Sequence, residues 1–68
     1  MNNRVAMVNG KKAVELTAEN GSWRLRWERN GKSHSQSFVL ESAEKWFNQL
    51  VELLRSSGEK VEVKEIKP

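Results

Sequence analysis

The chain has 68 residues, a net charge of +3 and no cysteine. A chain of this length forms one domain and buries only about 60% of its unfolded surface, so its margin of stability is small. This composition excludes disulfides and thiolate metal sites, and no apolar run approaches the roughly 20 residues of a membrane-spanning helix. The amino-terminal residues lack the apolar core of a signal peptide, so we expect a soluble cytoplasmic protein whose residues 1–68 form a single domain.

Three Asn-Gly pairs divide the first half of the chain, at Asn9-Gly10, Asn20-Gly21 and Asn30-Gly31. A two-residue type I′ turn requires positive φ at both central residues, and Asn-Gly adopts it at low steric cost. The pairs are spaced by one strand length. They therefore predict a four-stranded antiparallel meander with strands at about 4–8, 11–19, 22–29 and 32–39.

From Ser42 onward the apolar residues recur at helical spacing. Ser42 is the expected N-cap and Gly58 suits the left-handed position after the helix, which predicts a helix at about 42–56. Residues 60–68 alternate weakly and form either an extended tail or a short fifth strand. The predicted fold class is α+β, with one α-helix packed on one face of the meander.

The turns also predict which residues face each other, because a two-residue turn fixes the cross-strand register and directly opposed residues share a face. One face then collects the apolar side chains of Val5, Val14, Leu16, Ala18, Trp23, Leu25, Trp27 and Phe38. We expect the helix to cover this face with Phe47, Leu50, Leu54 and Trp46. The same face holds Asn3, His34 and Gln36, which we expect at its wet margin.

The opposite face is predicted to be flat and polar, in three rows across the strands: Arg4, Glu15, Arg26 and Ser35; Thr17, Arg24 and Ser37; Ala6, Ala13, Glu28 and Ser33. Residues 1–40 carry seven Lys/Arg against three Glu, so the basic excess belongs to the sheet. Basic surfaces attract polyanions.

An exposed antiparallel sheet can enter the DNA major groove, where arginine reads guanine and hydroxyl groups reach phosphates or bases. The sequence therefore predicts a small DNA-binding module for duplex DNA, with candidate contacts from Arg24, Arg26, Ser35, Ser37, Thr17, Arg4 and Lys32. The same pattern also fits an ordinary solvated face, in which Arg4, Glu15 and Arg26 form cross-strand ion pairs worth about 0–1 kcal/mol each.

No group of residues in the sequence suggests catalysis or a cofactor. Ser33, Ser35 and Ser37 alternate as in a solvated strand, without a base and an orienting partner. His34 is the only histidine, and we expect it to stack on Trp27 rather than to bind a metal. We therefore predict a non-enzymatic protein without cofactor or metal.

Residues 21–50 resemble the arm-type DNA-binding domain at the amino terminus of phage tyrosine integrases. The resemblance rests on Gly21-Ser22-Trp23-Arg24-Leu25-Arg26-Trp27, on Asn30-Gly31-Lys32, on Ser35-Gln36-Ser37-Phe38 and on the Ala43-Glu44 start of the helix. It implies a three-stranded sheet on one helix, with Arg24, Arg26, Ser35 and Ser37 facing the major groove. This chain departs from the pattern at residues 39–42, where the family commonly has a Thr-Lys pair, and by its extra amino-terminal strand.

Two other functions fit the same layout. A phage or prophage protein-interaction module could bind a host or partner protein through the edge of the fourth strand, through Trp46 and Leu53, or through the tail. The layout of four strands and a helix is also similar to that of single-stranded-DNA-binding transcriptional coactivators, which dimerise through the helix. We expect Trp46 or Leu53 to be partly exposed, which favours a homodimer through the helix or a strand edge.

Overall fold

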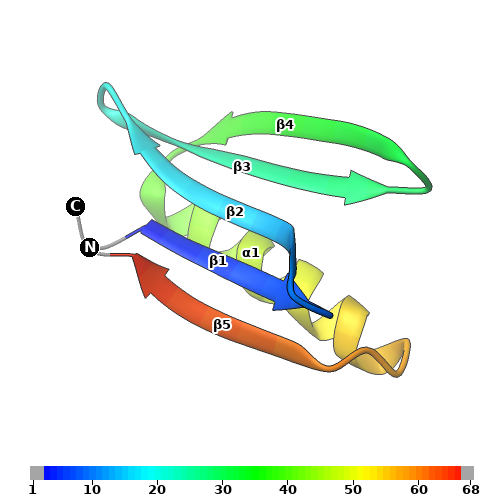
Figure 1. Ribbon diagram of the computed structural model, residues 1–68. Helices are drawn as coiled ribbons and strands as arrows, with labels where there is room; N and C mark the ends of the chain where they lie inside the picture. The colour runs from blue at the N-terminus through cyan, green and yellow to red at the C-terminus, as the bar shows by residue number, and fades with distance from the viewer. Residues whose placement is uncertain (1–2, 67–68) are drawn as a thin grey trace.

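Two layers make up the fold, a five-stranded antiparallel sheet and one helix that lies across one of its faces (Figure 1). This computed structural model describes residues 3–66, so residues 1–2 and 67–68 of the predicted domain and tail lie outside it. In chain order the elements are β1 (Asn3–Val8), β2 (Lys11–Glu19), β3 (Ser22–Arg29), β4 (Lys32–Phe38), α1 (Leu40–Ser56) and β5 (Val61–Ile66).

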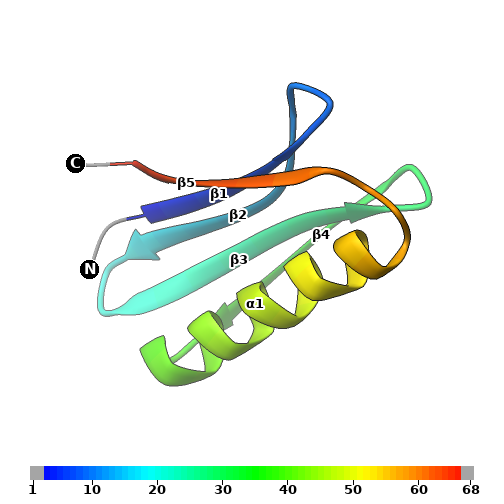
Figure 2. The same ribbon diagram turned by 90° about the horizontal axis from the view of Figure 1, so that it is seen from below.

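The order of the strands is β4-β3-β2-β1-β5, so the four-strand meander is extended by a strand from the carboxyl terminus. The α+β fold class is confirmed, and residues 61–66 form a true strand rather than a tail. Figure 2 shows α1 on one side of the sheet and no element on the other side. We call the uncovered side the open face.

Two of the three Asn-Gly turns have the predicted type I′ backbone. Asn9 and Gly10 have φ values of 52° and 78°, and Asn30 and Gly31 have 53° and 76°. The middle turn is different, because φ is positive only at Gly21, at 82°. That pattern is typical of a type II turn, so the type I′ prediction is wrong there. The middle turn still has two residues, and the register around it is unchanged.

The predicted register is confirmed from β2 to β4. Val14 lies opposite Trp27, and Trp27 lies opposite His34. Farther along, Leu16 pairs with Leu25 and Leu25 pairs with Gln36. The alternation of β3 therefore places its Trp and Leu side chains toward α1 and its Arg side chains on the open face.

The predicted register between β1 and β2 is wrong by one residue. Val5 lies opposite Glu15 rather than Val14, because the pairing shifts between Met7 and Ala6 and leaves Ala13 as an extra residue in β2. Such a β-bulge moves every later residue of the partner strand to the other face. Ala6 therefore packs in the core under α1, whereas Val5 belongs to the open face.

The composition of β1 explains why this one-residue shift of register is tolerated. Residues 5–8 are all apolar, so either register buries apolar side chains. In addition, β5 pairs with the outer side of β1 and makes it a central strand. Val5 and Ala6 are 4% and 0% exposed although they point to opposite faces.

The hydrophobic core lies between α1 and the middle of the sheet. Its buried members are Ala6, Val14, Leu16, Leu25, Ala43, Phe47 and Val51, with Trp23, Trp27, Phe38, Leu50 and Leu54 packed against them. Ala18, predicted for the core, is exposed near the β2–β3 turn. Trp46 and Leu53 are 48% and 61% exposed, which confirms the expectation that one of them is partly exposed. Trp46, which was also expected to cover the sheet, stacks on Phe38 of β4.

The helix begins two residues earlier than predicted. Its N-cap is Val39, which makes no side-chain capping hydrogen bond, so the prediction of Ser42 as N-cap is wrong. The carboxyl end follows the prediction, because Gly58 has a φ of 88°. The N–H of Glu59 donates to the carbonyl of Leu54, and the N–H of Gly58 donates to the carbonyl of Arg55. These two bonds are the Schellman motif, which turns the chain toward β5.

A substitution at Gly31 tests the role of the turns. Gly31→Val forces a β-branched side chain into positive φ, although no atom lies near the added Cβ. The strain should lower the free energy of unfolding by about 1–3 kcal/mol. Urea denaturation measures this loss, with Lys32→Val as a control that adds valine one residue later in a strand. Equal stability of the two variants would contradict the turn argument.

Candidate nucleic-acid interface

The centre of the open face consists of polar side chains from three neighbouring strands. The residues share this face because they lie opposite one another in the ladders: Glu15, Thr17 and Glu19 of β2, Arg24, Arg26 and Glu28 of β3, and Ser33, Ser35 and Ser37 of β4. The structure thus brings together five of the seven predicted contact residues, namely Thr17, Arg24, Arg26, Ser35 and Ser37.

Glu19 holds both arginines of this face. The Arg24 Nε donates to Glu19 Oε2 over 3.0 Å, and an Arg26 terminal nitrogen donates to Glu19 Oε1 over 3.2 Å. A second nitrogen of Arg24 donates to the Ser35 hydroxyl over 3.5 Å. One carboxylate therefore pairs with two of the four cations that the sequence assigns to DNA contact. The sequence does not indicate this role of Glu19, although its place in the alternation of β2 puts it on the same face.

These contacts change the acidity of Glu19. Its hydrogen bond with Arg24 lowers the pKa below the ordinary value of 4.5, and the charges of Arg24 and Arg26 act in the same direction. Partial desolvation raises the pKa, but its effect is smaller than that of the Arg24 hydrogen bond. Glu19 is therefore ionised at neutral pH and remains bound to both guanidinium groups.

The open face as a whole is electrically balanced. The register adds Lys12, Glu62 and Lys64 to it, because Lys12 and Glu62 lie opposite Met7 and Lys64 lies opposite Val5. Within the part of the chain that the structure describes, the face then carries four Lys/Arg and four Glu. The predicted basic excess of the sheet is therefore not located on the open face.

Arg4 does not belong to the open face. The bulge places it opposite Leu16, on the side of α1, where its Nε lies 3.8 Å from the Glu65 carboxylate. The predicted ion pairs of Glu15 with Arg4 and Arg26 are also absent among residues 3–66, since Arg26 pairs with Glu19. Val5 and Met7 replace Arg4 and Ala6 on this face, so its β1 portion is more apolar than predicted.

Lys32, the last predicted contact residue, lies in a separate basic region. It is opposite Arg29, beside the β3–β4 turn. The β1–β2 turn lies at the same end of the sheet as the β3–β4 turn, because β1 and β3 run in the same direction (Figures 1 and 2). We call Lys11, Lys12, Arg29 and Lys32 the basic end, of which Lys12 also belongs to the open face. All four side chains are exposed, and no ion pair between described residues includes any of them.

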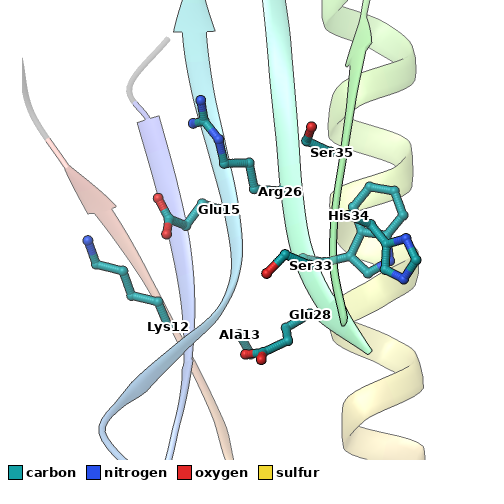
Figure 3. Close-up of a pocket in the computed structure, with 9 residues that line it drawn as sticks. Lys12, Ala13, Glu15, Arg26, Glu28, Ser33, His34 and Ser35 are labelled. Atoms are coloured by element: carbon teal, nitrogen blue, oxygen red, sulfur yellow. The ribbon is translucent and has the colours of Figure 1, made fainter. Parts of the chain in front are cut away.

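A hollow of about 330 Å³ lies on the open face next to the bulge (Figure 3). Lys12 and Arg26 line it together with Glu15 and Glu28, and Ser33 and Ser35 complete its polar wall. The mixture of charges gives the hollow no preference for anions. At its margin, His34 stacks on Trp27 with ring centroids 5.4 Å apart, which confirms the expected position of this histidine.

Residues 3–66 contain no group of His, Cys, Asp or Glu that could hold a metal ion. Among the same residues, no helix is long and apolar enough to span a membrane. A comparison with protein-family models, with curated proteins and with solved structures gives no match to this chain.

The lowered pKa of Glu19 predicts how stability changes with pH. Because the folded-state pKa lies below the unfolded one, the stabilising contribution of Glu19 is complete above pH 4.5 and is lost as pH falls through the folded pKa. Urea denaturation between pH 5 and 3 should therefore show a smaller loss of stability for Glu19→Gln than for the wild type. The control Glu28→Gln removes a carboxylate that has no ion pair in the described residues. If both variants lose stability as the wild type does, the Glu19 cluster does not contribute.

Proposed function

We propose that this domain is a small non-enzymatic module that binds duplex DNA, with the basic end as its main contact with the phosphate backbone. The proposal rests on four exposed cations that lie beside two hairpin turns at one end of the sheet. None of the four forms an ion pair with another described residue. Unpaired lysine and arginine supply most of the electrostatic free energy of DNA binding, because they release counterions from the phosphates.

The open face takes a secondary part in this proposal. Its charges cancel, so it adds little long-range attraction to a polyanion. Glu19 nevertheless binds Arg24 only through Nε and one oxygen, which leaves terminal N–H groups of this arginine for a base or a phosphate. Ser35, Ser37 and Thr17 offer small polar groups beside it. The open face therefore contributes short-range contacts after the basic end has bound.

The resemblance to the arm-type domain of phage integrases supports the same class of ligand. It covers β3, β4 and the first part of α1, and these elements contain Arg24 and Arg26 as well as Arg29 and Lys32 of the basic end. A phage or prophage origin and a cytoplasmic location, where DNA is accessible, are part of the proposal.

Charge-neutralising variants test the contribution of the basic end. The pairs Lys11→Gln with Lys12→Gln, and Arg29→Gln with Lys32→Gln, should each weaken binding to a mixed-sequence duplex roughly tenfold at low salt. Each lost phosphate contact should also reduce the salt slope by about 0.9. Fluorescence anisotropy at several salt concentrations measures both quantities.

The control removes one charge from another surface, with Lys45→Gln in the amino-terminal half of α1. It should retain the affinity and the salt slope of the wild type within about twofold. Equal losses in all three variants would show that only net charge matters. Absence of binding to both duplex and single-stranded DNA would reject the DNA-binding function itself.

Protein interaction is the second candidate function, and the surroundings of Trp46 favour it. This side chain is 48% exposed and stacks on Phe38 beside the free edge of β4, with ring centroids 6.3 Å apart. Val39, next to Phe38, is 70% exposed. An extended segment of a partner could add to β4 and cover these side chains. If the domain binds neither duplex nor single-stranded DNA in the anisotropy experiment, protein interaction becomes the favoured function.

A further inference from the structure

The outer edge of β5 has a charge pattern that is complementary to itself. β5 is the last strand of the sheet, so one side of its backbone has no partner strand. Its open-face side chains include Glu62 and Lys64, which lie opposite the apolar Met7 and Val5. Neither charge takes part in an ion pair between described residues. The β1 residues that lie opposite Glu62 and Lys64 therefore offer neither of them an opposite charge.

An antiparallel copy of β5 would supply those charges in one register. With the two-fold axis at Val63, Glu62 faces Lys64 of the second copy and Lys64 faces its Glu62. Directly opposed unlike charges stabilise a strand pair, and like charges destabilise it. An axis at Glu62, Lys64 or Glu65 would oppose two like charges. Among axes through the residues of β5, the axis at Val63 therefore opposes unlike charges of the two strands.

The exposed side chain of Val63 fits the same arrangement. It is 42% exposed. In the selected register the two Val63 side chains lie side by side on the face of α1, where each would be shielded from water by the other. The bare strand edge, the complementary charges and the exposed valine thus coincide at one axis.

We propose that two copies of this chain associate through β5, antiparallel about Val63, to form one continuous sheet. β5 would then be a central strand, as β1 already is, and the two basic ends would lie at opposite ends of the strands. This inference does not rest on the proposed DNA binding, because no residue of the basic end takes part in it.

Disulfide trapping tests the register directly, since the wild-type chain has no cysteine. Opposed residues of antiparallel strands have Cα atoms about 4.5–5.5 Å apart, within the range that a disulfide spans. Val63→Cys should form a covalent dimer rapidly under mild oxidation. Ser35→Cys, at the middle of the β4 edge, is the control and should remain monomeric. A monomeric Val63→Cys protein, or equal cross-linking of both variants, would overturn the proposal.

Charge reversal provides a second test that does not depend on oxidation. Lys64→Glu alone and Glu62→Lys alone should each convert the dimer to monomer in sedimentation equilibrium, because like charges then face each other. The double variant restores opposite charges and should restore the dimer. Both positions are exposed, and circular dichroism verifies the fold. Single variants with unchanged mass, or a double variant that stays monomeric, would refute the pairing of Glu62 with Lys64.

Discussion

The cross-strand register is the constraint on which the rest of this structure depends. Two-residue turns fix it between β2, β3 and β4, and one bulge at Ala13 fixes it between β1 and β2. Because side chains alternate between the faces of a strand, the turns place Trp23, Leu25 and Trp27 under α1 and Arg24 and Arg26 on the open face. The bulge then exchanges the faces of β1, so that Ala6 joins the core and Arg4 leaves the open face.

This register also determines where the charges of the protein can act. It places Glu19 close enough to bind Arg24 and Arg26, and it places Glu15 and Glu28 among the remaining polar groups of the open face. Four of the cations without an ion pair in the described residues, Lys11, Lys12, Arg29 and Lys32, flank the hairpin turns. A surface selected by composition alone would be the whole sheet, whereas the structure gathers these four charges at its basic end.

The sequence predicts the part of the fold in which local signals agree. In β3 the strict alternation and the flanking Asn-Gly pairs indicate the same register, and the structure confirms it. In β1 the apolar run of residues 5–8 contains no alternation, so the sequence cannot locate the bulge. Glu19 pairs with two arginines that do not lie directly opposite it, because these long side chains reach diagonally across the strands. A register gives only the directly opposed residues, so it does not predict this pairing. The early start of α1 at Leu40 was missed because Ser42 is the better capping residue, although the structure does not use it.

An NMR titration of the isotope-labelled protein with a mixed-sequence duplex is the most direct test of how the register distributes charge. Our account predicts that the largest amide shift changes occur at residues 9–12 and 29–32, around the two hairpin turns of the basic end. Smaller changes should appear at Arg24 and Ser35. Changes centred on residues 24–26 and 35–37 with none at the turns, or no changes at all, would contradict the account.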